Sequence, residues 1–322
     1  MLTSPRHHGE STIVYLSGRY LPKGEALISP DDRGFLFADG VYEVLRFYDG
    51  RFFLLEEHLA RLAHSMEAIR LSPGPDQLWP SWTDVFDELV SRNGLTGTDG
   101  FVYLQVTRGA APRSHAFPPP SVPPTMYAYV WEHPRSADDR RRHDGVAAIT
   151  YPDRRWGRCD IKSVALLPNV LAQQAAVDRG AYEAILCRQD GPREGALQEP
   201  VLRDDAIVTE GSHSSLFMVR HGEVRTHPLN EGVLPGITRS FVVELAEEAN
   251  VGLREEIFTL RELQTADEAF LTGTGSEIAP VVRLDHEPVG SGTPGPITRR
   301  LQTLFEDRVA TFRRFARDSR QR

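Results

Sequence analysis

Lys162 is the residue of this sequence whose type and setting most directly suggest chemistry. It lies in the segment 158–163, at the break between a polar turn and an apolar stretch. Lysine side chains are among those least often fully buried, so a lysine in such a setting invites a chemical interpretation. A desolvated ammonium has a lowered pKa, and the free amine can attack a carbonyl to form a Schiff base. Because most lysines are solvated surface charges, the interpretation depends on what the other residues supply.

Glu210 could act as the partner of a protonated ring nitrogen. It ends the apolar, strand-like run 206–209 and precedes Gly211. A carboxylate held beside a ring nitrogen keeps that nitrogen protonated, because a nearby opposite charge favours the charged form. The other interpretation is a surface acid at a strand end, and Glu210 taken by itself favours it.

Two turns could bind a phosphate through backbone N–H groups. The segment 233–239 contains Pro235-Gly236 and opens a helix, where freed N–H groups and the positive end of the helix dipole would face outward. The segment 272–276 follows a strand, and its glycines allow an anion to approach the backbone closely. Pro-Gly and Gly-Thr-Gly sequences also form ordinary turns, so that alternative stays open for each segment.

Arg113 and His115 could bind a carboxylate from the loop 108–124, which is rich in Pro, His and Arg. Arginine presents a rigid fork that matches a carboxylate, and histidine adds a second donor. A loop this long inside a compact domain is more often functional than idle. A solvated pair on a flexible surface loop is the alternative.

Four other residues have a plain structural interpretation. Tyr42 and Tyr103 lie on strand-like segments, where a tyrosine is usually a core residue with its hydroxyl at the edge. Arg61 falls off the apolar stripe of its helix, which indicates exposure to solvent. Cys159 could be a nucleophile, but a small buried hydrophobic residue is the better interpretation.

Composition narrows the class of protein. The 322 residues contain 40% hydrophobic and 25% charged residues, which are ordinary globular values. The net charge of −8 argues against broad nucleic-acid binding and suits a protein that handles small molecules. The sequence contains no disulfide framework, metal-ligand spacing, eight-residue phosphate loop, signal core or apolar run long enough to span a bilayer. We therefore expect a cytoplasmic protein without a metal site, a nucleic-acid partner or a membrane anchor.

The pattern of apolar residues predicts an α/β protein with two domains. We expect a small α+β domain over residues 1–134 and a larger α/β domain over 135–322, joined by a charged linker at about 132–144. The segment 189–205 is charged and contains Gly and Pro, which indicates a surface insertion. The expected strands are 14–16, 51–55, 101–107, 127–131, 146–151, 182–187 and 269–272. The expected helices are 59–69, 81–93, 167–179, 238–250 and 298–316.

Six short motifs resemble, in the same order, those of fold-type IV pyridoxal-phosphate enzymes. They span about residues 31 to 280 and lie at 32–44, 57–62, around Lys162, at 209–212, 235–239 and 274–278. The block 107–115 is similar to the carboxylate-binding loop of the D-amino-acid aminotransferases, so the chain most resembles that branch. The resemblance implies two domains with the active site between them, a pyridoxal 5'-phosphate cofactor, and a homodimer with active sites at its interface.

The resemblance also implies a role for individual residues. Lys162 would hold the cofactor as a Schiff base and move the proton, while Glu210 would pair with the pyridine nitrogen. Leu234 would pack on the ring. The phosphate would be held by Arg61, Gly236, Ile237, Thr238, Gly273 and Thr274. The substrate α-carboxylate would be bound by Tyr42, Arg113 and His115, the last two reaching in from the other subunit, and Tyr103 would line the pocket.

The sequence departs from the family's pattern at a few positions. Ser215 stands where the family usually has asparagine, and His213 replaces a small polar residue in the same turn. Gly273 and Gly275 replace hydroxyl residues, which removes donors but keeps backbone N–H groups. These changes bear on substrate range and cofactor affinity more than on reaction class.

The resemblance favours an aminotransferase that moves an amino group from a D-amino acid, such as D-alanine or D-glutamate, to a 2-oxo acid. A branched-chain L-amino-acid or (R)-amine transaminase would share Lys162 and Glu210 but use another carboxylate anchor. An aminodeoxychorismate lyase would be a different reaction on the same fold, and a non-catalytic dimer is the third class. The intact Lys, Glu and Arg set argues against the non-catalytic relative.

Overall fold

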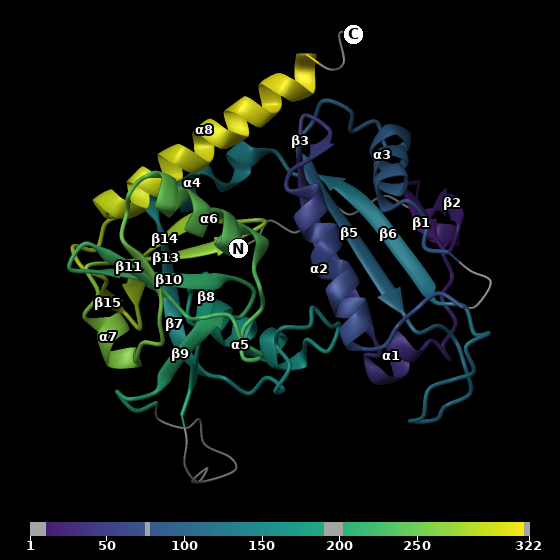
Figure 1. Cartoon of the computed structure of the whole chain (residues 1–322), viewed down its shortest axis with the longest axis horizontal. Helices are drawn as coiled ribbons and strands as arrows, with labels where there is room; N and C mark the ends of the chain where they lie inside the picture. Colours follow the sequence, from purple (N-terminus) through teal and green to yellow (C-terminus); the bar gives the residue numbers. More distant parts are fainter. Residues whose placement is uncertain (1–10, 75–77, 190–201, 319–322) are drawn as a thin grey trace. The chain divides into compact units, whose positions relative to one another are not determined.

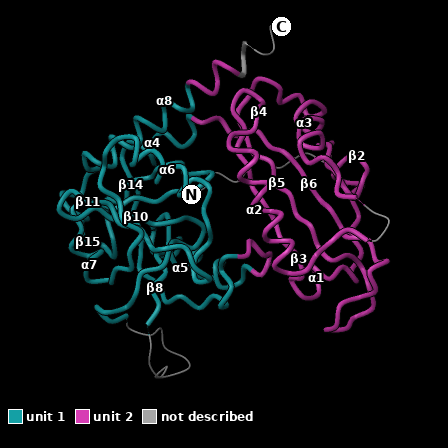
Figure 2. The backbone as a smooth tube through the Cα atoms, in the orientation of Figure 1, with its two compact units in different colours: residues 1, 136–160, 166–310 teal, residues 2–135, 161–165, 311–322 magenta. Residues whose placement is uncertain are grey.

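The chain divides into two compact units. The structure is a computed structural model that describes residues 11–74, 78–189 and 202–318. Unit 1 contains residues 136–160 and 166–310, and unit 2 contains residues 2–135, 161–165 and 311–322 (Figure 2). The short segment 161–165, which carries Lys162, therefore belongs to unit 2, although the residues on either side of it belong to unit 1.

Unit 2 is built on an antiparallel sheet. Within its described residues the sheet has six strands in the order β2-β1-β6-β5-β3-β4 (Figure 1). The strands are β1 (Ile13–Leu16), β2 (Arg19–Pro22), β3 (Gly40–Tyr48), β4 (Arg51–Phe52), β5 (Gly100–Thr107) and β6 (Thr125–Glu132). The helices are η1 (Lys23–Glu25), α1 (Arg33–Phe37), α2 (Leu55–Ala68) and α3 (Trp82–Arg92).

Strand alternation gives this sheet two different faces. Val102, Leu104 and Val106 of β5 join Leu62 of α2 and Phe86 of α3 in one buried core, so both helices cover the same face. The capping pair predicted at the start of α3 is confirmed, since the Ser81 side chain accepts a hydrogen bond from the Asp84 N–H. On the opposite face the rings of Tyr42 (β3), Tyr103 (β5), Tyr129 and Trp131 (β6) follow one another at centroid separations of 5.4 to 5.8 Å.

Unit 1 is built on a larger mixed sheet. Its described strands follow the order β12-β11-β10-β13-β14-β7-β8-β9, and β15 pairs with β14 (Figure 1). The strands are β7 (Val146–Pro152), β8 (Glu183–Arg188), β9 (Ile207–Gly211), β10 (Ser215–Arg220), β11 (Glu223–Thr226), β12 (Leu253–Glu255), β13 (Glu268–Gly273), β14 (Glu277–Leu284) and β15 (Glu287–Pro288). The helices are η2 (Arg135–Asp138), α4 (Asp139–Asp144), α5 (Leu167–Asp178), α6 (Ile237–Glu248), α7 (Leu260–Gln264) and α8 (Pro296–Asp318), of which residues 296–310 belong to this unit.

Helices pack on both faces of the unit 1 sheet. Ile149 of β7 and Ala184 of β8 form a cluster with Ala172 of α5. The alternate strand residues, such as Ala148 and Ile185, form a larger cluster with α7. β7 pairs in parallel with both β14 and β8, and α5 forms the crossover between β7 and β8. The predicted α/β fold is confirmed.

Two of the predicted segments differ from the structure. The strand expected at 51–55 is only two residues long, because Leu54 adopts a left-handed conformation and Leu55 starts α2. The stretch 132–144 was expected as a linker, but η2 and α4 fold most of it into helix. Most of the insertion predicted at 189–205 lies outside the described residues. Among the described residues, no helix is long and apolar enough to cross a membrane. The two-domain boundary near residue 135 stays a prediction.

Candidate active site

The backbone of Lys162 is fixed on both sides by unit 2. Its N–H donates to the Ser65 hydroxyl of α2 at 3.2 Å, and its C=O accepts from the Tyr42 N–H of β3 at 3.0 Å. The side chain is half-buried, and its Nζ lies 4.3 Å from the centroid of the Tyr42 ring. The Tyr103 ring stacks on Tyr42, and its hydroxyl donates to Gln105 at 2.7 Å. The structure therefore brings together Lys162, Tyr42 and Tyr103.

A buried acid, Glu43, links Arg61 and His58 beside this lysine segment. Arg61 donates to both carboxylate oxygens of Glu43, at 2.7 and 2.9 Å, and His58 Nδ1 lies 2.9 Å from Oε2. Arg61 is buried, so the exposure predicted from its place off the apolar stripe is wrong. Burial by itself would raise the pKa of Glu43, but Arg61 and His58 lower it far below its usual range. The nearby Glu43 carboxylate would raise the pKa of His58, but burial lowers it and has the larger effect.

Arg113 and His115 meet at one aromatic ring. The Arg113 guanidinium lies 5.1 Å from the centroid of Phe37 in α1, and the His115 ring lies 5.4 Å from it. Between them, the Ser114 carbonyl accepts a hydrogen bond from the buried Arg33 at 2.6 Å. Both Arg113 and His115 are exposed, but the loop backbone is anchored. Sequence reasoning did not identify Arg33 as the anchor.

The loop 108–124 is held at its base as well. Arg108 donates to Asp39 and to the carbonyls of Ile69 and Arg70 at the end of α2, at 2.7 to 3.1 Å. Gly109 has a φ of +85°, and a Cβ there would lie 2.1 Å from the Pro123 carbonyl oxygen, so only glycine fits. The structure thus favours an ordered loop over the flexible one that the sequence left open.

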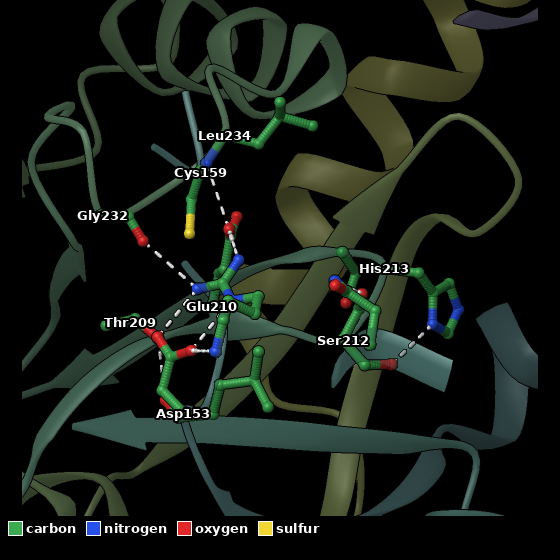
Figure 3. A network of polar contacts seen from close by, with 12 residues as sticks. Asp153, Cys159, Thr209, Glu210, Ser212, His213, Gly232 and Leu234 are labelled. Atoms are coloured by element: carbon green, nitrogen blue, oxygen red, sulfur yellow. Dashed lines mark hydrogen bonds and ion pairs between the residues drawn. The ribbon is translucent and has the colours of Figure 1, made fainter. Parts of the chain in front are cut away.

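In unit 1, Glu210 is the centre of a buried network (Figure 3). Its Oε1 accepts from Arg155 Nη1 and, at 3.1 Å, from the N–H of Leu234. Arg155 also donates to Asp153 at 3.0 Å and to the Gly232 carbonyl at 3.2 Å. Within the described residues, Oε2 of Glu210 is the oxygen left for another donor.

Burial governs the titration of this network. It raises the pKa of Glu210, and the Arg155 guanidinium opposes that rise. Glu210 is therefore a carboxyl whose charge needs a donor beside it, rather than the solvated surface acid of the alternative interpretation. Burial also raises the pKa of Cys159 to about 11, so this thiol is a poor nucleophile at neutral pH. Arg155, seven residues before Lys162, was missed, and the sequence carries no signal for its pairing with Glu210.

The two predicted phosphate-binding turns also belong to unit 1. α6 begins at Ile237, and its N-cap residue Gly236 provides no side-chain cap, so the first N–H groups of the helix lack that partner. Thr238 is buried in this first turn. A Cβ on Gly236 would lie 2.7 Å from the Ser215 hydroxyl, so this turn packs against β10.

The second turn follows β13. Gly273 ends that strand, and Thr274 lies in the turn to β14. The hydroxyl of Thr272, just before them, is buried and has no hydrogen-bond partner among the described residues. An unpartnered buried hydroxyl is costly in a finished core, so it fits a turn that receives a polar ligand.

The predicted site residues fall into two groups. Unit 2 contains Lys162, Tyr42, Tyr103, Arg61, Arg113 and His115. Unit 1 contains Glu210, Leu234, Gly236, Ile237, Thr238, Gly273 and Thr274. The structure joins Lys162 to Tyr42, places Arg113 and His115 at the same Phe37 ring, and joins Glu210 to the Leu234 backbone.

Comparison with known proteins identifies the family. Residues 40–284 match the family of class IV amino-transferases. The chain belongs to this family. It is 40% identical to a D-alanine aminotransferase of Staphylococcus haemolyticus over 91% of this chain and 96% of that protein.

Solved structures support the same assignment. A branched-chain amino acid aminotransferase of T.th. with pyridoxamine 5'-phosphate aligns with a TM-score of 0.77 and 27% identity, covering 92% of this chain and 93% of that chain. The Escherichia coli branched-chain enzyme aligns with a TM-score of 0.78 at 23% identity, covering 92% and 94% of the two chains, which shows the shared fold. The protein is an aminotransferase that depends on pyridoxal phosphate.

The residues described above fit this cofactor. Glu210 has a buried carboxylate oxygen that could accept a ring N–H, and the N-terminus of α6 and the Thr272 hydroxyl have donors that could bind a phosphate. In unit 2, the half-buried Lys162 has an amine of the kind that this cofactor binds. Which of these groups contacts the cofactor stays a prediction.

Proposed function

We propose that the protein transfers the amino group of a D-amino acid, such as D-alanine or D-glutamate, to a 2-oxo acid. The observation that carries this proposal is the 40% identity to a D-alanine aminotransferase over 91% of the chain. The pair Arg113 and His115, gathered at Phe37 and backed by Arg33, supports it. A planar guanidinium beside an imidazole is a good receptor for an α-carboxylate.

Lys162 is the residue proposed to handle the proton. When bound, the cofactor acts as an electron sink that weakens the bonds at the substrate Cα. The Lys162 amine would take the Cα proton and return it at the cofactor C4′. The hydrogen bonds to Ser65 and Tyr42 fix the Lys162 backbone, so the amine works from a defined position.

Glu210 and Arg155 are proposed to set the charge around the ring nitrogen. The Glu210 carboxylate would accept the ring N–H and keep it protonated, and Arg155 would keep that carboxylate charged in its buried position. Ile237, Thr238 and Thr274 would bind the phosphate, with Gly236 and Gly273 leaving room for it. Leu234 would pack on the ring. Arg61 would add a positive charge, although it already pairs with Glu43.

We also propose how substrate and subunits are arranged. Tyr42, Arg113 and His115 would fix the α-carboxylate, and Tyr103 would line the pocket beside Tyr42. Arg113 and His115 are exposed, which suits residues that serve the active site of a second subunit in a homodimer. We expect the dimer to be cytoplasmic.

The experiment that tests the proposal is a half-reaction screen without a 2-oxo acid. Purified enzyme is mixed with D-alanine, L-leucine or (R)-1-phenylethylamine, and bleaching of the lysine-bound cofactor absorbance is followed. We expect D-alanine to bleach the band faster than the other two donors. Arg113→Ala should slow D-alanine roughly 30-fold, the value of a charged hydrogen-bonded pair, and leave the amine, which lacks a carboxylate, unaffected. Bleaching by L-leucine alone would contradict the proposal and favour a branched-chain enzyme.

A further inference from the structure

A second buried acid in unit 1, Glu183, lies outside the residues assigned so far. It opens β8 and its side chain is fully buried. Its carboxylate accepts from the N–H and hydroxyl of Ser212, at 3.0 and 2.5 Å, and from the Ser214 hydroxyl at 2.7 Å. It also accepts from the N–H of Ala184 at 2.8 Å. One carboxylate therefore holds both ends of the turn 212–214.

The middle residue of this turn, His213, carries the matching charge. Its Nδ1 lies 3.0 Å from Glu183 Oε2 and 3.2 Å from the Ser212 hydroxyl, the contact visible in Figure 3. Among the described residues that contact the Glu183 carboxylate, His213 is the side chain that can become positive. The His213 side chain is 44% exposed, so it can exchange protons with solvent while its partner stays buried. Burial alone would raise the pKa of Glu183, but His213 and the two serines lower it.

This pair lies directly against the strand end that carries Glu210. A Cβ built on Gly211, the residue after Glu210, would lie 2.7 Å from Glu183 Oε2 and 2.3 Å from the Ser214 hydroxyl. The Gly211 N–H also bonds the Ser214 carbonyl at 2.7 Å. Gly211 is thus needed for the close approach of the Glu183 carboxylate to the backbone next to Glu210.

The turn also reaches the loop after β13. A Cβ on Gly273 would lie 3.8 Å from the His213 carbonyl oxygen and 3.9 Å from Ser214 Cβ. The turn 212–214 therefore lies against two of the segments of unit 1 that are proposed to hold the cofactor, those of Glu210 and Gly273.

We propose that Glu183 and His213 are a positioning pair whose opposite charges cancel beside the cofactor. If only one of the two charges were present, it would shift the protonation equilibrium of the lysine-bound cofactor. This inference rests on the proposed role of Glu210. A protonated His213 leaves the pair with no net charge, and its removal leaves a buried negative charge next to Gly211. At close range and in a partly desolvated site, one uncompensated charge shifts the pKa of a neighbouring ionisable group by about half a unit or more.

The other ionisable groups near His213 are unchanged in the variants that test this proposal. The Tyr182 ring packs edge-on against the His213 ring, with their centroids 5.7 Å apart. The guanidinium of Arg141 in α4 lies 5.0 Å from the centroid of the same Tyr182 ring. Burial raises the pKa of Tyr182 to about 12, so it stays neutral at working pH. Arg141 also pairs with Asp138 at 2.6 Å. His213 is the member of this group whose side chain the variants change.

The test compares His213→Asn, Glu183→Gln and the double variant with the wild type. Asparagine keeps a donor near the position of Nδ1 but cannot carry charge. The pH midpoint of the lysine-bound cofactor absorbance is measured, together with cofactor retention on dialysis. Because a negative charge favours the protonated chromophore, His213→Asn should raise the midpoint by about half a unit. Glu183→Gln in that background removes the charge and should return the midpoint to the wild-type value.

A matched control is available on the surface. His143 and Asp144 are also in contact, at 2.8 Å, but their side chains are 83% and 67% exposed. His143→Asn should leave the midpoint unchanged. An unshifted midpoint in His213→Asn, or a shift that the double variant retains, overturns the inference while leaving the cofactor band, and hence the proposed function, intact. A wild type without such a band would instead contradict the proposed function.

Discussion

At the scale of single residues, the Arg155 guanidinium joins three separate segments of unit 1. It reaches Glu210, Asp153 and the Gly232 carbonyl, and its side chain is 7% exposed. Removing one partner of a buried pair leaves an uncompensated charge, which typically costs about 3–5 kcal/mol. The same change would leave Glu210 without the group that opposes the rise in its pKa.

We therefore expect Arg155→Met to lower the free energy of unfolding by about 3 kcal/mol and to weaken cofactor binding. Urea unfolding and cofactor retention on dialysis measure the two effects. Arg158→Met is the control, because Arg158 pairs with Asp160 at the surface and should matter little. Equal behaviour of the two variants would show that Arg155 does not support Glu210.

At the scale of elements, β3 and α2 are joined by Glu43, His58 and Arg61. Strand alternation places Glu43 on the core face, where a charged residue needs partners, and α2 supplies both. Because the folded-state pKa of Glu43 is depressed, its stabilisation is complete above its unfolded value of 4.5 and is lost as the pH falls below it. The depressed pKa of His58 acts in the same direction below 6.5.

The prediction is that the unfolding free energy decreases as the pH falls from 7 to 3, and that Glu43→Gln reduces the part of this dependence that lies below pH 4.5. Urea unfolding at several pH values measures it. Since Glu43→Gln also removes a buried charge partner, the slope with pH is the relevant quantity rather than the stability at one pH. An unchanged slope would mean that other carboxylates govern the acid sensitivity.

Sequence patterns predicted the elements better than the contacts between them. The apolar spacing of α2 and the cap of α3 are local, and both were confirmed. The burial of Arg61 depends on Glu43, which lies 18 residues away on another element, so local spacing could not show it. The same holds for Arg155 and Glu210, which are 55 residues apart. The helix in 132–144 was hidden by charges that are typical of a solvated linker.

At the scale of the whole molecule, the proposed dimer makes a specific claim about Arg113. If it serves the active site of the partner subunit, then Lys162→Ala and Arg113→Ala subunits complement each other in a mixed dimer. Each hybrid dimer would have one intact site and one site with both defects. Random mixing makes half of the dimers hybrids. Because each hybrid has one intact site of its two, about a quarter of wild-type activity should return. Mixed refolding followed by an assay measures this, and no recovery would place Arg113 in the same subunit's site.

The central claim, that Lys162 carries the cofactor, can be tested with a control built into the sequence. Lys23 and Lys162 are the only lysines in the chain, and Lys23 lies over the Tyr129 ring instead. Borohydride reduction of the holoenzyme, followed by peptide mass spectrometry, locates the cofactor directly. We expect the phosphopyridoxyl group on Lys162, and we expect Lys162→Ala, but not Lys23→Ala, to abolish the visible absorbance. Label on Lys23, or a band that persists in Lys162→Ala, would contradict the account.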